Sequence, residues 1–183
     1  MSAARWESYR DKGVQLFAAH ELMVSQIQEG ATAKVAGPGG VRDVPFDQYF
    51  IGPREDVLRE NVLKPDEIMT EVTIPAPAAG TRMAWTKLKD RQVYDFAVVS
   101  VAVAVVPDAS GKWSDGRIVL GGVSPVPYRA KVVEDALKGQ DIKATARTAA
   151  GQIRTVARPM SLNAYKVDIA QNLIERTLLQ ALG

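Results

Sequence analysis

The sequence predicts an α+β fold, in which helices pack on one face of an antiparallel sheet. Two observations predict it. Between residues 83 and 123, three segments rich in valine and other apolar residues follow one another through short connections, as in an antiparallel meander. From residue 130 onward, the apolar residues recur at helical spacing instead. With 183 residues, 46% of them apolar, the chain can bury one good core or two small ones.

The first part of the chain predicts a short helix and a hairpin. The helix is expected over residues 20–28, and Gly30 ends it. Residues 31–36 and 41–45 predict two strands, joined by the turn sequence Gly-Pro-Gly-Gly at 37–40. The same glycines can be interpreted as a phosphate loop, but no helix follows to offer its N-terminus to a phosphate, so the hairpin is preferred.

A third strand and a linker follow. The turn sequence at 64–69 leads into a strand that continues through Val72 and Ile74. The sequence PAPAAG at 75–80 is typical of a linker. It is expected to separate a smaller N-terminal lobe from a C-terminal one.

The C-terminal lobe is expected to contain a three-stranded sheet. Its strands are predicted at 83–88, 97–106 and 117–123, and residues 107–116 form a polar connection. In the middle strand only Ser100 is not apolar, which favours a central strand buried on both faces.

Three helices are predicted to cover this sheet. The first spans residues 130–137 and ends at Gly139, and the second spans 144–157. Asn163 is the expected N-cap of the third. One apolar stripe on that helix is formed by Val167, Ala170, Leu173, Ile174 and Leu178.

Composition excludes several classes of function. The net charge is only +2 and neither sign forms a long block, which argues against a nucleic-acid or anionic-membrane surface. Cysteine is absent, so the chain carries no disulfide, thiolate metal site or iron–sulfur cluster. The N-terminus shows no signal peptide and the apolar runs are too short to span a bilayer. We therefore expect a soluble, cytoplasmic protein.

The loop before the middle strand holds the best candidate functional residues. Asp95 is either a carboxylate near a bound aromatic ring or a turn residue that caps backbone amides. Lys87, Lys89 and Arg91 either bind an anionic cofactor or are simply solvated.

Other positions also leave two interpretations open. Met69 fills a gap in the core or contacts a cofactor. The pair Gly121 and Gly122 allows close approach of a ligand or another backbone, or forms a bulge. No nucleophile elbow, HExxH or Walker motif is present. From its residues alone, the chain is an α+β protein with a candidate ligand loop.

Four segments, in this order and spacing, resemble one known family. They are VLKPDEIMTEVTIPAPAAGTR, KLKDRQVYDFAVVSVAVAVV, IVLGGVSPVPYRA and RPMSLNAYKVDIAQNLIERTLL. Together they resemble the FAD-binding (medium) subunit of the molybdenum hydroxylases, the family of xanthine dehydrogenase, aldehyde oxidoreductases and aerobic carbon monoxide dehydrogenase. The resemblance extends from about residue 19 to the end.

The resemblance implies a division of the chain. Residues 1–76 resemble part of the family's FAD-binding domain, and residues 81–183 resemble its C-terminal domain, an antiparallel sheet with helices. In the family, two glycine-rich loops of an N-terminal subdomain hold the FAD pyrophosphate and adenosine. No such loops occur in this sequence. The chain is therefore expected to lack most of the FAD-binding half.

The resemblance also implies flavin contacts. Glu21 stands where the family usually has an aspartate, and Met69 stands where an apolar residue packs on the cofactor. Lys87 matches a lysine at the end of a strand beside it. The loop that borders the isoalloxazine ring contains Tyr94, Asp95 and Phe96. Apolar packing and nearby charges are what a flavin requires of a protein.

The function implied is that of a flavin-side subunit. It would pass electrons from the iron–sulfur clusters of a small subunit through FAD to an acceptor, while a molybdopterin-binding large subunit oxidises the substrate. The chain is not expected to be active alone. An alternative is a flavin-free structural or assembly subunit that keeps only the docking surfaces of the family. Another is that a separate polypeptide supplies the missing half.

Overall fold

The structure is a computed structural model and describes residues 30–183, apart from residues 92 and 94. In chain order the elements are β1 (Thr32–Gly37), β2 (Gly40–Pro45), the 3₁₀ helix η1 (Phe46–Gln48), β3 (Ile68–Thr73), β4 (Arg82–Leu88), β5 (Val99–Pro107), β6 (Trp113–Gly121), β7 (Tyr128–Arg129), α3 (Lys131–Leu137), α4 (Ile142–Gly151), α5 (Ile153–Val156) and α6 (Tyr165–Leu182). The helix predicted at 20–28 lies outside the described residues. The α+β class is confirmed.

The first sheet has the strand order β2-β1-β3, and all its pairs are antiparallel. The predicted hairpin is confirmed, because Gly37 pairs with Gly40 and only Pro38 and Gly39 lie between them. Gly40 has a φ of 107°, a conformation that glycine adopts without a steric cost. The four residues 37–40 therefore form a hairpin turn, and the interpretation as a phosphate loop is wrong. This sheet and its long loop, residues 31–74, are called the lobe below.

The second sheet has the strand order β4-β5-β6-β7. Three strands were expected, and the additional strand β7 is only two residues long, too short to leave a periodic pattern in the sequence. β6 also begins earlier than expected, at Trp113. The side chain of Trp113 is buried and its amide donates to the Gln140 carbonyl at 2.9 Å. Tertiary contacts therefore extend the strand into a segment that looks polar in the sequence.

β5 is the central strand, as predicted. Val101 in its middle pairs with Thr86 of β4 on one side and Leu120 of β6 on the other. One face of β5 joins a helix-side core through Val99, Val101, Val103 and Val105. The opposite face joins a lobe-side core through Ala102, which lies in one cluster with Val119 of β6 and with Ala33 and Val35 of β1. Burial on both faces is confirmed.

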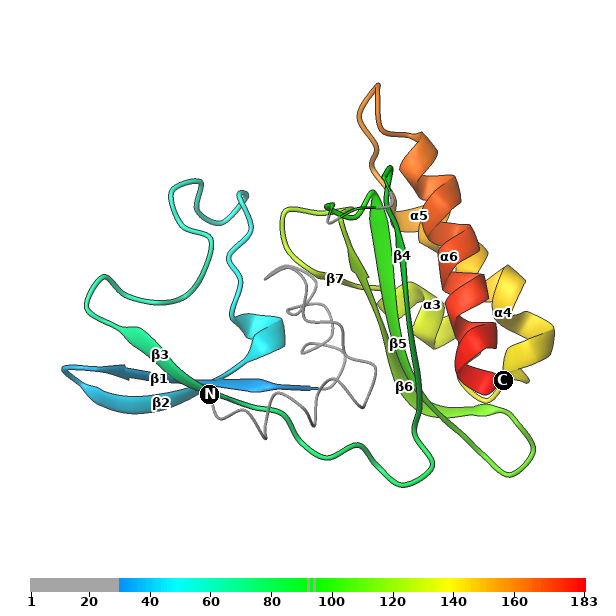
Figure 1. Ribbon diagram of the computed structural model, residues 1–183, viewed down its shortest axis with the longest axis horizontal. Coiled ribbons are helices and arrows are strands. Elements are labelled where there is room, and N and C mark those ends of the chain that lie inside the picture. Colours follow the sequence, from blue (N-terminus) through cyan, green and yellow to red (C-terminus); the bar gives the residue numbers. More distant parts are fainter. Residues whose placement is uncertain (1–29, 92, 94) are drawn as a thin grey trace.

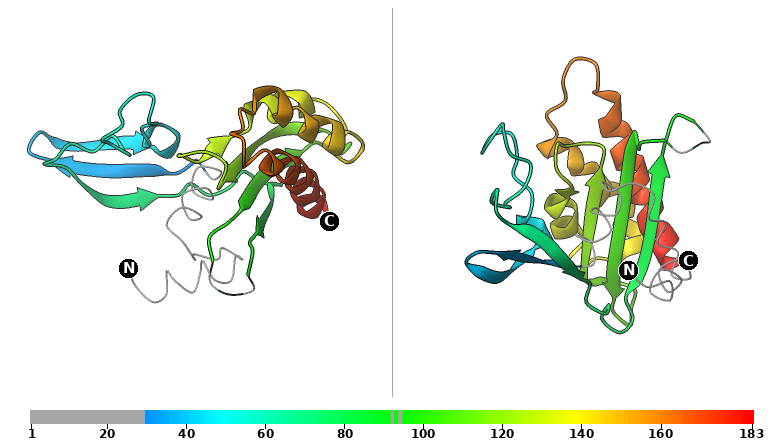
Figure 2. Two further views of the ribbon diagram at one scale, coloured as in Figure 1. Left: turned by 90° about the horizontal axis from the view of Figure 1, so that it is seen from above. Right: turned by 60° about the vertical axis from the view of Figure 1, so that its left-hand side comes forward.

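The helices cover one face of the second sheet and the lobe lies on its other side (Figures 1 and 2). The linker at 75–80 has no regular secondary structure and joins β3 of the lobe to β4. Among the described residues, no helix is both long enough and apolar enough to cross a membrane.

Two helix boundaries differ from the predictions. The second helix begins at Ile142, where the Asp141 carboxylate accepts from the Ala144 amide at 2.8 Å, and it is interrupted between α4 and α5 at Gln152. Asn163 is not the N-cap of α6. That position belongs to Ala164, and the Asn163 side chain instead accepts from the Met160 amide at 2.7 Å, inside the preceding loop.

The predicted apolar stripe of α6 does face the core. Ala170, Leu173, Ile174 and Leu178 are buried, and Val167, near the start of the helix, is half-buried. This long helix packs across β4 and β5. It therefore holds in place the two strands that precede and follow the candidate loop.

Candidate functional site

The candidate loop connects β4 to β5 at one end of the second sheet. The amide of Val98 donates to the Leu88 carbonyl at 2.8 Å, which closes the loop at its base. Within it, Lys89 Nζ donates to the Val93 carbonyl at 3.0 Å. The β5–β6 hairpin lies at the other end of the same strands, so the loop stands on a rigid base far from that turn (Figure 1).

Asp95 is held within the loop by a two-pronged ion pair. Arg91 Nε donates to Asp95 Oδ2 at 2.9 Å and Arg91 Nη2 donates to Oδ1 at 3.2 Å. The Phe96 amide also donates to Oδ1, at 3.0 Å. The hydrogen bond from Arg91 is the main reason that the pKa of Asp95 is lowered, and the charge of Lys87 lowers it further. Asp95 is thus an anchored anion that also caps a backbone amide.

Lys87 lies on the face of β4 that looks away from the helices. Its neighbour Thr86 donates to Gln180 of α6, and successive side chains of a strand point to opposite faces. Lys87 is directly opposite Ser100 of β5. Its charge acts on Asp95, so the structure brings these two predicted residues together.

Two further predicted residues lie in the candidate loop and in the lobe. Phe96 is 81% exposed, an unusual position for a large aromatic side chain. Met69 is half-buried in β3 and packs against the lobe-side core, as does Trp85 of β4. Glu21 and Tyr94 lie outside the described residues.

Two buried polar atoms on the same face have no hydrogen-bond partner among the described residues. They are the indole nitrogen Nε1 of Trp85 and the hydroxyl of Ser100. Ser100 is fully buried and stands opposite Lys87. An unpaired buried donor is a costly feature that needs an explanation. The sequence analysis did not assign either residue to the site, although Ser100 is the one polar residue in the apolar run.

The groups on this face have chemistry that the ring of a flavin can use. Lys87 and the two unpaired donors lie on one face of the sheet, the anchored Asp95 lies in the adjoining loop, and Met69 lies in β3 of the lobe. An isoalloxazine ring offers both an apolar surface and carbonyl acceptors. No group of three metal-ligating side chains exists within the described part of the chain, and the sequence has no cysteine.

The glycine pair after β6 serves the backbone. Gly122 has a φ of 75°, and a Cβ atom there would lie 2.9 Å from the Val98 carbonyl oxygen and 3.0 Å from that of Ala97. The strand pairing shows no register shift at Gly121. Of the interpretations left open by the sequence, the close approach of another backbone is therefore correct at Gly122, and no bulge occurs.

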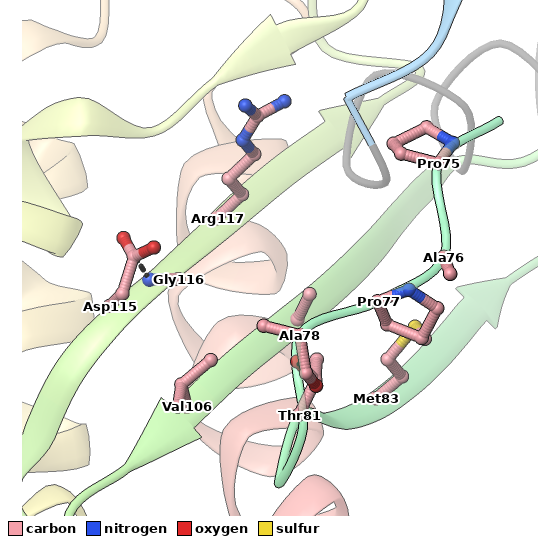
Figure 3. A pocket seen from close by; sticks show the side chains of 11 residues that line it. Pro75, Ala76, Pro77, Ala78, Thr81, Met83, Val106, Asp115, Gly116 and Arg117 are labelled. Carbon is pink, nitrogen blue, oxygen red and sulfur yellow. Dashed lines mark hydrogen bonds between the residues drawn. The ribbon is translucent and has the colours of Figure 1, made fainter. Parts of the chain in front are cut away.

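Two cavities lie elsewhere. One, of about 160 Å³, lies between the linker and the sheet (Figure 3), and it is lined by Pro75, Ala76, Pro77, Ala78, Thr81, Met83, Ala104, Val106, Asp115, Gly116 and Arg117. The other, of about 350 Å³, is formed by residues 49–61 of the lobe and by residues 125–127. Of the predicted cofactor contacts that the structure describes, none lines either cavity.

Comparisons with known proteins identify relatives along most of the chain. The chain is 29% identical to the FAD-binding subunit of aldehyde oxidoreductase from Escherichia coli, over 85% of this chain and 46% of that protein. It is 33% identical to the carbon monoxide dehydrogenase medium chain of Hydrogenophaga pseudoflava, over 78% of this chain and 49% of that protein. It thus spans about half the length of the curated relatives that it matches.

Solved structures show the same likeness. A structure of carbon monoxide dehydrogenase from Hydrogenophaga pseudoflava, which lacks the Mo-pyranopterin moiety of its cofactor, superposes with a TM-score of 0.76 and 33% identity. The match covers 87% of this chain and 55% of that one. Residues 84–181 match the family model described as the CO dehydrogenase flavoprotein C-terminal domain. This match confirms the resemblance to the medium subunits, and the chain belongs to the CO dehydrogenase flavoprotein C-terminal domain family.

Proposed function

We propose that this chain is the flavin-side subunit of a molybdenum hydroxylase complex, or the part of it that contacts the isoalloxazine ring. The observation that carries the proposal is the anchored anion Asp95 in the loop that follows β4, whose pKa is also lowered by the charge of Lys87 near the end of that strand, in a chain whose relative in Escherichia coli is a FAD-binding subunit. In such a complex, FAD collects electrons from iron–sulfur clusters and delivers them to an acceptor.

The residues of this chain have distinct roles in the proposal. Met69 packs against one face of the ring, and Phe96 shields its edge from water. Lys87 places a positive charge near the pyrimidine side of the ring, where negative charge accumulates on reduction. Asp95 balances that charge. Because Arg91 fixes its carboxylate, this balance is present before the cofactor arrives. Glu21 and Tyr94 are further contacts of the same proposal.

The proposal divides the chain into two parts. Residues 1–76, which include the lobe, resemble part of an FAD-binding domain, and residues 81–183 form the C-terminal domain. Two observations support this division: the family match to residues 84–181, and the lack of regular secondary structure in the linker at 75–80. The sequence holds none of the glycine-rich loops that bind pyrophosphate in the family, so another stretch of polypeptide must supply them.

Partners follow from the same proposal. A molybdopterin-binding large subunit oxidises the substrate and an iron–sulfur small subunit carries the electrons, and this chain is not active alone. The proposal keeps the cytoplasmic location expected from the sequence. One alternative is a flavin-free assembly subunit that only docks the partners.

The flavin content of the assembled complex tests the proposal. The chain is co-expressed with a large and a small subunit of the family, and the complex is purified with this chain present or omitted. We expect flavin absorption only when the chain is present. A complex that contains this chain but no flavin would support the assembly subunit instead, and a complex that keeps its flavin without the chain would contradict both.

A further inference from the structure

The face of the second sheet that looks toward the lobe carries two hydrogen-bond donors without partners. Trp85 Nε1 and the Ser100 hydroxyl are both buried, and neither reaches an acceptor among the described residues. Since these atoms are shielded from bulk water, a hydrogen bond left unmade within the described part of the chain is destabilising. Native proteins seldom keep such atoms without a ligand, an ordered water or a functional reason.

The two donors are neighbours in the sheet and border the proposed flavin site. Ser100 is directly opposite Lys87, and Trp85 is directly opposite Ala102. Side chains opposite each other in an antiparallel pair have Cβ atoms about 4.5–5.5 Å apart. Trp85 and Lys87 are two residues apart on β4 and therefore share a face. Lys87 and the two donors therefore lie on one face of two neighbouring strands.

The chemistry of the donors restricts what they can bind. An indole N–H donates only, and a serine hydroxyl can donate while its oxygen also accepts. A group that satisfies both must present acceptors close together and be flat enough to lie along a sheet. The pyrimidine edge of an isoalloxazine ring has this form, with carbonyl oxygens beside ring nitrogens.

We propose that Trp85 Nε1 and the Ser100 hydroxyl donate hydrogen bonds to the pyrimidine edge of the flavin and raise its reduction potential. This inference rests on the proposed function. Negative charge increases on that edge when the ring is reduced, so donors aimed at it stabilise the reduced form more than the oxidised form. Lys87 adds its charge on the same side.

The test compares the variants Ser100→Ala and Trp85→Phe of this chain with the wild type, each assembled with the large and small subunits. Thr177→Val is the matched control, because Thr177 is also fully buried but its hydroxyl donates to the Leu173 carbonyl at 2.6 Å in the helix layer. FAD is removed and titrated back, and the midpoint potential of the bound flavin is measured. We expect each site variant to bind FAD roughly 2- to 10-fold more weakly, the equivalent of one hydrogen bond, and to shift the potential to more negative values. Thr177→Val should change neither quantity.

A second measurement separates the flavin role from a structural one. Without FAD, Ser100→Ala removes an unsatisfied hydroxyl, so the melting temperature of the complex should stay the same or rise. With FAD, the same variant should gain less stability from the cofactor than the wild type does. If Trp85→Phe prevents assembly, Ser100→Ala decides the question by itself.

The outcomes are distinct. Unchanged FAD affinity and potential in the variants that assemble would overturn the inference and would indicate that the donors hold ordered water only. A wild-type complex without flavin would overturn the proposed function and this inference with it.

Discussion

The guanidinium group of Arg91 holds both carboxylate oxygens of Asp95, with Nε 2.9 Å from Oδ2 and Nη2 3.2 Å from Oδ1. The arginine is largely exposed, at 71%, whereas the Asp95 side chain is only 15% exposed. The exposed residue thus orients the shielded one. A charge whose position is set before a cofactor binds needs no rearrangement to act on it.

The first prediction concerns the central strand. Val101→Asp should prevent folding, because Val101 is fully buried in the helix-side core and an unpaired buried carboxylate costs several kcal/mol, comparable to the stability of a whole domain. The same substitution at Ile68, which is 66% exposed on β3, should be tolerated. Solubility and a cooperative thermal transition are the measurements. A soluble, cooperatively folded Val101→Asp protein would refute the position of the strand.

A second prediction concerns acid sensitivity of the lobe. Arg42 donates to both carboxylate oxygens of Glu67, at 2.9 and 2.7 Å, and the Lys64 amide donates at 2.8 Å. These hydrogen bonds lower the pKa of Glu67 from 4.5 to about 2, and the hydrogen bond from Arg42 has the largest effect. Because the folded pKa is the lower one, the carboxylate stabilises the folded state above pH 4.5, and this contribution is lost as the pH falls toward about 2.

The variant Glu67→Gln should remove that pH dependence. Its stability to urea should be lower than that of the wild type at pH 6, and the difference should shrink as the pH is lowered from 4.5 toward 2. Glu55→Gln, on an exposed carboxylate of the same loop, is the control. A constant difference between Glu67→Gln and the wild type over this range would contradict the role of the ion pair.

A third prediction concerns a buried ion pair between α3 and the second sheet. Glu134 of α3 accepts from Arg129 Nη2 at 2.9 Å and from the Ile118 amide of β6, also at 2.9 Å. Its side chain is 6% exposed and that of Arg129 is 29% exposed. Glu134→Ala would leave two donors unpaired, so we expect a loss near the lower end of the about 3–5 kcal/mol typical of a broken buried pair.

Urea denaturation measures this loss. The control is Asp135→Ala, whose partner Lys138 and whose own side chain are both largely exposed, and which should change stability little. Equal effects of the two variants would show that the Glu134 pair does not connect α3 to the sheet in the way described.

Much of the fold was predictable because apolar periodicity determines it. The valine-rich run of β5 and the stripe of α6 have only one arrangement that buries them, and the turn residues at 37–40 specify a hairpin. The start of β6 was not predictable. Trp113 stands among polar residues, and tertiary contacts draw it into the sheet: it pairs with Pro107 of β5, is buried in the helix-side core and bonds to the segment after α3. The same holds for β7, which is too short for any pattern.

The candidate site was less predictable than the fold. Lys87 and Asp95 entered through family resemblance, and the structure then brought their charges together. The Arg91 clamp depends on the shape of an irregular loop, which no sequence period describes. The unpaired donors of Trp85 and Ser100 are visible only when burial and partners are known for each atom.

A fourth prediction is that this chain alone binds FAD weakly or not at all. The FAD pyrophosphate is normally held by backbone amides of glycine-rich loops. The glycine-rich sequence of the lobe, residues 37–40, is a hairpin turn instead. Each missing charge-assisted hydrogen bond costs roughly 1.5–3 kcal/mol, and about 1.4 kcal/mol corresponds to a tenfold loss of affinity. Fluorescence titration of the isolated chain with FAD checks this. A stoichiometric complex of submicromolar affinity would show that the pyrophosphate is held by residues not recognised above.

The midpoint potential of the flavin in the assembled complex, compared between wild type and Asp95→Ala, tests the central claim most directly. Asp95 lies on a loop, so the variant should fold and assemble, and its flavin should shift to a more positive potential because a negative charge near the ring has been removed. Asp108→Ala is the matched control, since that carboxylate also caps loop amides but lies in the hairpin at the opposite end of the strands. A shift in Asp95→Ala alone is the predicted result. Identical flavin content and potential in all three proteins would contradict the assignment of the loop to the flavin site.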